Sequence, residues 1–309
     1  MPRILVVAPN WIGDALMAQP LLSRLRGAEI DVIAPEWVAP VMRRMPEVRS
    51  VIDTPFRHGP LQLRERWALA RALKRENYSQ AFVLPNSWKS ALIPFFAGIP
   101  KRTGYVGEAR YGLLNDARKA TGASMAAHYA ALGGEGPVAQ PRLEVSREEI
   151  DQAKRKFGIA SRYSVLCPGA EYGPAKRWPY FAELSRRLAL PAVVLGSTKD
   201  REASGGISGT DLAGKTSLDE AIALIAGADF VVSNDSGLMH VAAALGRPQV
   251  ALFGSSSPEH TPPQSPAARV LWLHIECSPC YQRECPLGHF RCMREMPVEM
   301  VLDQLKTVS

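Results

Sequence analysis

The segment from Ile4 to Leu25, ILVVAPNWIGDALMAQPLLSRL, holds the pattern that decides the fold. It begins with a continuous apolar run over 4–8, which is typical of a strand buried on both faces. Apolar residues then recur at every third or fourth position, which predicts a helix whose buried face holds Ala15, Ala18, Leu22 and Leu25. A second apolar run over 30–34 predicts the next strand. A strand, a helix and a strand in this order form a βαβ unit with two parallel strands.

Asp14 follows a glycine at the point where the first strand gives way to the helix. A carboxylate there accepts hydrogen bonds from the free N–H groups of the first turn and is stabilised by the helix dipole. Taken alone, these residues favour helix capping over catalysis for Asp14.

The same alternation of strands and helices continues along the chain. In the first half it predicts a helix over 67–74 and a strand over 80–84. A loop-like stretch, GGEGPVAQP over 133–141, and a capping-box sequence at 146–149 then precede a second series. This series is predicted to contain strands at 164–167, 192–195, 230–233 and 249–253, and helices at 180–188, 218–226 and 238–245.

The length of 309 residues exceeds that of an ordinary single domain. We therefore expect an α/β fold with two doubly wound, Rossmann-like domains, residues 1–150 and residues 151–309.

The formal net charge of +7 indicates a negatively charged partner. Nucleic acid is not favoured as that partner, because no block of five or six basic residues and no nucleic-acid-binding motif is present. No apolar run reaches the roughly 20 residues that a membrane helix needs, and the first residues read as a strand rather than a secretory leader. The expected location is the cytoplasm.

The clearest chemical motif is CPGAEYGPAKRWP, residues 167–179. Gly169 and Gly173 stand between a predicted strand and a predicted helix, where backbone N–H groups can hold phosphate oxygens. Lys176 and Arg177 add positive charge there. The motif is not a Walker A loop, and the first strand is not followed by a Gly-x-Gly-x-x-Gly pattern. A turn with an exposed basic pair explains these residues equally well.

A second motif, VVSNDSGLMH over 231–240, places polar residues at the end of a buried strand. The carboxyl ends of parallel strands are the usual ligand crevice of such sheets. Capping explains one of these residues but not the whole cluster, which consists of Asn234, Asp235, Ser236, Gly237 and His240. The chain contains no Asp-x-Asp pair of the kind that holds a divalent metal beside a diphosphate, which predicts chemistry without a metal or a cofactor.

Taken together, four stretches resemble the ADP-heptose:lipopolysaccharide heptosyltransferases, most closely the heptosyltransferase II branch of that family. They are PNWIGDALMAQP (9–20), PNSWKSALIPFFAGIPKRTGY (85–105), CPGAEYGPAKRWP (167–179) and NDSGLMHVAAALGRPQVALFGSSSPEHTPP (234–263). The resemblance runs over nearly the whole chain and implies the GT-B architecture, two Rossmann-like domains facing a central cleft. It also implies metal-independent, inverting transfer of L-glycero-D-manno-heptose from ADP-heptose to the first heptose of the lipopolysaccharide inner core.

The resemblance further implies roles for individual residues. Asp14 matches the proposed general base of the family, and Lys176 would stabilise the leaving diphosphate. Asp200, after the strand at 192–195, is placed to accept from a ribose hydroxyl, although capping explains it equally well. The acceptor candidates in the N-terminal half are Lys89, Arg102 and Arg110. The donor candidates are Gly169, Lys176, Arg177, Asp200, Asp235, Ser236, Gly237 and His240.

The expected partners are ADP-heptose and an anionic inner-core acceptor, with peripheral contact at the cytoplasmic face of the inner membrane. Two enzyme alternatives remain open: a non-hydrolysing sugar-nucleotide epimerase of the same architecture, and a heptosyltransferase with a different inner-core acceptor. From another class, a binding or redox module could be organised around the cysteines.

Four cysteines near the C-terminal end form the segment CSPCYQRECPLGHFRC, with His289 among them. In a cytosolic protein such a cluster indicates metal ligation more readily than disulfides. The separations of two, four and six residues do not match a standard zinc ribbon. Four reduced thiols are therefore favoured over a metal site for Cys277, Cys280, Cys285 and Cys292.

Overall fold

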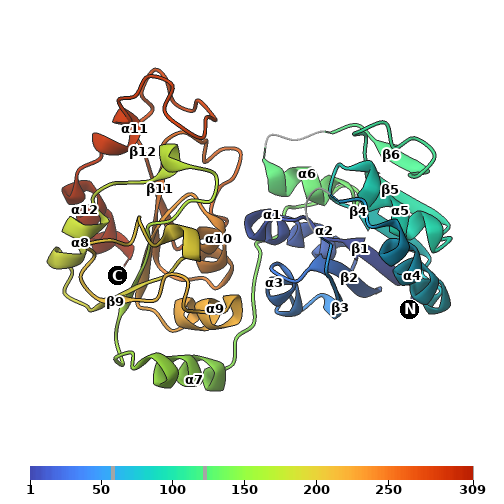
Figure 1. Ribbon diagram of the computed structural model, residues 1–309, viewed down its shortest axis with the longest axis horizontal. Coiled ribbons are helices and arrows are strands. Elements are labelled where there is room, and N and C mark those ends of the chain that lie inside the picture. Colours follow the sequence, from blue (N-terminus) through green and yellow to red (C-terminus); the bar gives the residue numbers. More distant parts are fainter. Residues whose placement is uncertain (57–59, 121–123, 309) are drawn as a thin grey trace. The chain divides into compact units, whose positions relative to one another are not determined.

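The structure is a computed structural model that describes residues 1–56, 60–120 and 124–308. The chain divides into two compact units, Met1–Pro141 and Arg142–Ser309 (Figure 1). The predicted domain boundary at 150/151 would cut through α7 (Arg147–Phe157), which lies wholly in the second unit. The predicted capping box opens this helix, with both of its reciprocal bonds between Ser146 and Glu149 present.

The first unit contains a six-stranded sheet in which every neighbouring pair of strands is parallel. The strand order is β3-β2-β1-β4-β5-β6. Ile4 of the central strand is in register with Ile30 on one side and Gln80 on the other. The strands are β1 (Arg3–Val7), β2 (Glu29–Pro35), β3 (Val48–Thr54), β4 (Gln80–Val83), β5 (Lys101–Tyr105) and β6 (Asp116–Arg118).

The helix predicted around Ala15–Leu25 is instead two short helices that meet at Ala18. Pro20 explains the break, because it has no N–H to continue the hydrogen-bonding ladder of the preceding turn. The helices of this unit are α1 (Ile12–Met17), α2 (Gln19–Arg24), α3 (Ala39–Arg43), α4 (Leu63–Leu73), the 3₁₀ turn η1 (Lys74–Glu76), α5 (Trp88–Phe96) and α6 (Met125–Ala131).

The second unit repeats the architecture with a parallel sheet of order β12-β11-β10-β7-β8-β9. Its strands are β7 (Ser164–Cys167), β8 (Ala192–Val194), β9 (Thr210–Asp211), β10 (Phe230–Asn234), β11 (Gln249–Phe253) and β12 (Ala268–Trp272). Its remaining helices are η2 (Pro174–Lys176), α8 (Phe181–Arg187), η3 (Thr198–Asp200), α9 (Leu218–Ala226), α10 (Gly237–Ala244), α11 (Arg291–Arg294) and α12 (Val298–Val308). The predictions for β7, α9 and β11 are confirmed to the residue.

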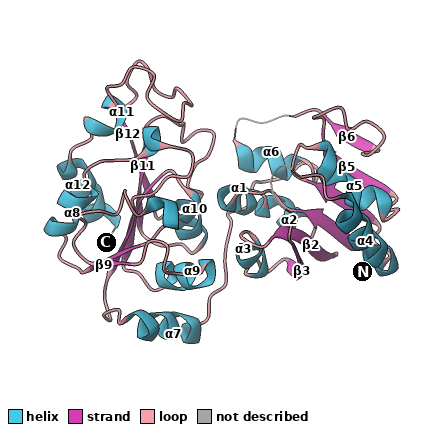
Figure 2. Ribbon diagram, viewed as in Figure 1, coloured by secondary structure: helices cyan, strands magenta, loops and turns pink. Residues whose placement is uncertain are grey.

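Both sheets have the doubly wound order 3-2-1-4-5-6 when the strands of each are counted along the chain. The first and fourth strands are therefore neighbours, and the chain leaves them toward opposite edges of the sheet. Figure 2 shows helices around the strands of each unit, as a parallel sheet with both faces buried requires. Within the described ranges, no helix is both long enough and apolar enough to cross a membrane.

Candidate functional site

The first unit has a cavity of about 450 Å³ at the point where its strand order reverses, between β1 and β4. Residues 8–11, which follow β1, and residues 84–87, which follow β4, line it together with Pro35 and Thr54 at the ends of β2 and β3. A cavity at the carboxyl ends of parallel strands, at a switch point, is where ligands bind in open α/β sheets.

Asp14 lines this cavity from the first turn of α1. The N-cap residue of the helix is Trp11, whose side chain makes no capping bond. Tyr129 lies across the same cavity, and burial, reinforced by the charge of Asp14, raises the pKa of its hydroxyl. Asp14 therefore combines a position that the helix dipole favours with access to a ligand-sized space.

The three predicted acceptor residues do not lie together. Lys89 lines the cavity. Arg110 is buried, and its guanidinium donates to the carbonyls of Tyr105 and Pro85. Arg102 donates to the carbonyls of Leu113 (2.7 Å) and Ile99 (2.6 Å). Both arginines hold backbone in place, and neither is among the residues that line the cavity. Their contact with acceptor anions stays a prediction.

The corresponding switch point of the second unit lies between β7 and β10. Asn234, at the end of β10, ties together the two loops that start there. Its Nδ2 donates to the carbonyl of Pro168 (2.7 Å), and its Oδ1 accepts from the backbone N–H of Trp178 (3.1 Å). The two motifs at 167–179 and 231–240 are thereby brought side by side.

An ion pair joins these motifs. Lys176 Nζ lies 2.5 Å from Asp235 Oδ2, which also accepts from the hydroxyl of Ser256 (2.5 Å). The Lys176 side chain keeps 16% of its surface exposed, against 5% for Asp235. An ammonium has three N–H donors, so Lys176 can bind an anion while it remains paired with Asp235.

His240 lies one turn into α10 and is buried beside this pair. Burial is the main cause that lowers the pKa of its imidazole. The negative charge of Asp235 opposes the shift and the positive charge of Lys176 adds to it, and the resulting pKa is about 4. The imidazole is therefore neutral at pH 7, with one nitrogen that donates and one that accepts.

Helix α10 begins at Gly237, just after Asp235, in the loop that follows β10. Ser236 is the N-cap residue, yet its side chain makes no capping hydrogen bond. Its hydroxyl lies 3.2 Å from that of Ser233 instead. Free N–H groups at a helix start, together with the helix dipole, favour a bound anion.

Asp200 is buried against Gly169, as a Cβ on Gly169 would lie 2.2 Å from the Asp200 carboxyl carbon. Oδ2 of Asp200 accepts from the N–H and the hydroxyl of Ser197, both at 2.8 Å. The capping interpretation is thus confirmed, while Oδ1 has no hydrogen-bond partner among the described residues. Arg177 is half-buried in the adjoining loop.

The sequence pattern of glycosyltransferase family 9 (heptosyltransferase) matches residues 66–291. The chain belongs to this glycosyltransferase family. It is 42% identical to lipopolysaccharide heptosyltransferase 2 of Escherichia coli K12, over 99% of this chain and 98% of that protein. It is 39% identical to lipooligosaccharide heptosyltransferase 2 of Haemophilus influenzae, over 98% of each chain.

Solved structures agree with this assignment. The structure of E. coli ADP-heptose LPS heptosyltransferase II superposes with a TM-score of 0.88 at 41% identity, covering 99% of this chain and 98% of that one. E. coli heptosyltransferase WaaC with ADP shares the fold, with a TM-score of 0.72 at 20% identity over 99% of this chain and all of that one. The expected GT-B-like α/β fold is confirmed, and a sugar-nucleotide epimerase is not favoured.

Sequence reasoning missed several residues of this family 9 glycosyltransferase. The indole rings of Trp11 and Trp37 line the first cavity and are 55% and 47% exposed. Ser256, which supports Asp235, lies in the loop after β11. Their positions could have identified them, because Trp11, Trp37 and Ser256 each follow the carboxyl end of a predicted strand, where ligands bind in such sheets.

The low pKa of His240 gives a pH prediction. The folded chain binds fewer protons than the unfolded chain between the ordinary pKa of 6.5 and about 4. The free energy of unfolding should therefore fall as the pH drops through this range, and His240→Gln should flatten that part of the profile. Chemical unfolding followed by circular dichroism at several pH values measures it, with His274→Gln, on an exposed histidine, as the matched control. An unchanged slope in His240→Gln would contradict the neutral, buried assignment.

Proposed function

We propose that this glycosyltransferase transfers L-glycero-D-manno-heptose from ADP-heptose to the first heptose of the lipopolysaccharide inner core. The observation that carries the proposal is the 42% identity to two lipopolysaccharide heptosyltransferase 2 proteins over 99% of the chain. The donor is assigned to the switch point of the second unit and the acceptor to the cavity of the first.

The donor diphosphate would be held by Lys176 and by the N–H groups at the start of α10, with Ser236 and Gly237 as donors. Its negative charge increases as the sugar–phosphate bond breaks. Fixed positive charges and N–H dipoles directed at it therefore stabilise the transition state more than the ground state. In the part of the chain that the structure describes, no group of three or more His, Cys, Asp or Glu side chains is arranged to hold a metal ion. The proposed charge stabilisation uses Lys176 and the N–H groups at the start of α10.

The remaining donor contacts follow from charge and hydrogen-bonding capacity. Asp235 is anionic and is best matched to heptose hydroxyls, and neutral His240 can both donate to and accept from them. The free Oδ1 of Asp200 is suited to accept from a ribose hydroxyl, while Gly169 leaves room for that carboxylate. Arg177 would add positive charge beside the diphosphate.

Asp14 would act as the general base in a single inverting displacement. The acceptor hydroxyl transfers its proton to the Asp14 carboxylate while its oxygen bonds to the anomeric carbon of the donor. The bond from that carbon to the diphosphate oxygen breaks, and ADP leaves with the electron pair. Lys89 lines the same cavity and would pair with acceptor anions. Trp11 and Trp37 would offer flat apolar surfaces to the acceptor sugars.

Asp14→Asn tests the base. The amide cannot accept the proton, so turnover should fall about 10²- to 10⁴-fold while affinity for ADP-heptose stays unchanged. ADP release in the presence of a heptosyl-Kdo2-lipid A acceptor measures the rate, and calorimetric titration measures donor binding. Asp151→Asn, on an exposed face of α7, is the matched control. Near-normal turnover in Asp14→Asn would refute the assignment.

Lys176→Ala tests the diphosphate site. Loss of the ammonium should weaken ADP-heptose binding and lower turnover by about 10²- to 10³-fold, because the lysine acts on charge that grows in the transition state. Lys156→Ala, which breaks the surface pair with Glu220, is the control. If donor affinity and rate both matched the unsubstituted enzyme, Lys176 would not contact the diphosphate.

We further propose that the face formed by α4 and α5 makes peripheral contact with the membrane that carries the acceptor. Trp67, Phe95 and Phe96 are 51%, 41% and 38% exposed there. Arg71 lies over the ring of Trp67 and Arg102 over that of Phe95. Exposed aromatic rings beside arginines suit an anionic interface.

Sedimentation with vesicles tests this contact. The protein should co-sediment with vesicles rich in anionic lipid and not with neutral ones, and Trp67→Ala combined with Phe96→Ala should reduce binding several-fold. Val270→Ala, at an exposed apolar residue of the second unit, is the control. Equal binding by the double variant would place the membrane contact elsewhere.

A further inference from the structure

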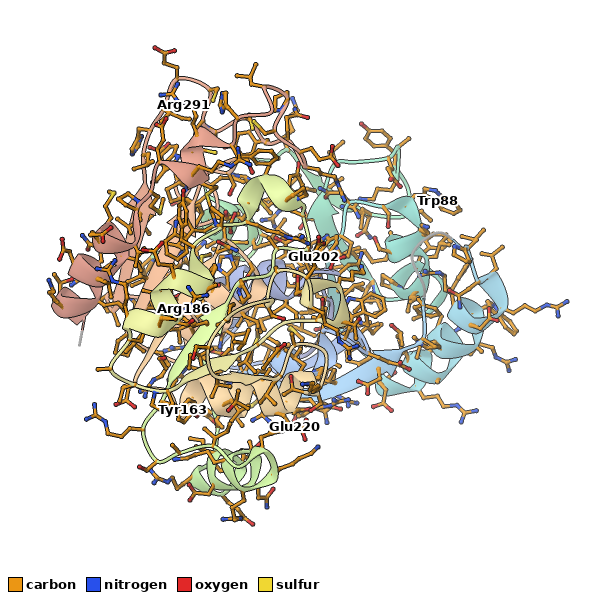
Figure 3. The ribbon with its side chains drawn as sticks, turned by 60° about the vertical axis from the view of Figure 1, so that its left-hand side comes forward. Trp88, Tyr163, Arg186, Glu202, Glu220 and Arg291 are labelled. Carbon is orange, nitrogen blue, oxygen red and sulfur yellow. The ribbon has the colours of Figure 1, made fainter. Side chains whose placement is uncertain are left out.

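The four cysteines of the segment 277–292 surround one small cavity. Together with His289 they line a space of about 20 Å³ with almost entirely apolar walls. A single water-sized sphere needs roughly 10–15 Å³, so the space holds one small occupant. All four cysteines are free thiols. Arg291, the neighbour of Cys292 at the start of α11, marks the place of this segment at the surface in Figure 3.

The backbone is shaped around one of these sulfurs. The sequence Cys285-Pro-Leu-Gly forms a tight turn in which the Gly288 N–H donates to the Cys285 carbonyl (3.0 Å) and Gly288 has a φ of 68°. The N–H of Phe290 then donates to Cys285 Sγ at 3.4 Å. Such an N–H group stabilises a thiolate, the form that ligates metals.

We propose that Cys277, Cys280, Cys285 and Cys292 form a four-thiolate site for one divalent ion of the Zn²⁺ or Fe²⁺ type. Thiolate sulfur is the preferred ligand of these ions, and four such ligands close a tetrahedral, structural site. Each thiol releases its proton to solvent on binding. The ion also removes the repulsion that four thiolates around one cavity would otherwise suffer.

Metal binding would require the cysteine side chains to rotate. As they lie, no three metal-ligating groups in the described ranges are arranged to hold an ion. The sulfurs of Cys277 and Cys285 lie 4.0 Å from Nε2 and from Nδ1 of His289, so the imidazole stands between them. Nδ1 accepts from the N–H of Arg291 at 3.0 Å, so this nitrogen is already engaged with backbone. The proposed ligand set is therefore the four sulfurs. The sequence alone favours free thiols, and the shared cavity reverses that preference.

The site would brace the loop that carries Lys176. Ala175, the neighbour of Lys176, lines the cavity, and its N–H donates to the carbonyl of Arg283 within the cysteine segment (3.0 Å). The hydroxyl of Tyr172 donates to the carbonyl of Tyr281 at 2.6 Å. Gly173 fits only without a side chain, since a Cβ there would lie 2.4 Å from the Arg283 oxygen.

Metal content and cobalt titration of the full chain test the proposal. The purified, chelator-washed protein should contain about one zinc or iron per chain by elemental analysis. After metal removal under reducing conditions, added Co²⁺ should give the sulfur-to-metal charge-transfer and tetrahedral ligand-field absorption of a thiolate site. The titration uses the unsubstituted chain, so it does not depend on a variant that folds.

Variants assign the ligands. Cys285→Ser and Cys292→Ser should each lower metal affinity by at least about tenfold, while His289→Ala and Cys167→Ala, the matched thiol control in β7, should retain it. Absence of both bound metal and the cobalt absorption, or equal binding by the Cys285 and Cys292 variants, would overturn the site. Disulfides between these cysteines in freshly purified protein would also overturn it.

The contact between the cysteine segment and the Lys176 loop allows a further test by enzyme kinetics, which rests on the proposed function. Metal removal should raise the KM for ADP-heptose through the Lys176 loop, and added metal should restore it. A metal-loaded protein without transferase activity would refute the proposed function and leave the metal site standing.

Discussion

The crossover of the chain at the centre of each parallel sheet is the constraint on which the rest depends. Because the first and fourth strands are neighbours, the loops after them leave toward opposite edges and open a space at the carboxyl ends. In the first unit that space is the cavity lined by Asp14. In the second it holds the Lys176–Asp235 pair. One topological rule, used twice, positions residues that are far apart in sequence.

At the second switch point, hydrogen bonds between a buried asparagine and the backbone hold the polar residues in place. Lys176 and Asp235 come from different loops, and Asn234 holds those loops together through two backbone contacts. Removal of one partner of a nearly buried ion pair leaves an uncompensated charge, which is far more costly than the pair itself. His240 avoids that cost because burial keeps it neutral. The Lys176 ammonium keeps spare donors within this pair.

The cysteine segment is connected to this site through backbone. Its contacts reach the loop at Tyr172 and Ala175, directly beside Lys176. A loop that binds a charged ligand needs outside support, because its own short 3₁₀ turn, η2, has few internal hydrogen bonds. Contacts with the segment 277–292 give the Lys176 loop this support, as the proposed diphosphate site requires.

The sequence by itself determined the two doubly wound units, the bounds of seven strands to within one residue, and the positions of the two chemical motifs. Local periodicity suffices for these, because a buried strand or an amphipathic helix is specified by residues close together in the chain. Only the tertiary structure decided that Arg102 and Arg110 serve backbone carbonyls, that Trp37 and Lys89 share a cavity with Asp14, and that four cysteines meet around one space. These are contacts between distant segments, and no local pattern records which side chains a sheet and its crossovers will bring together.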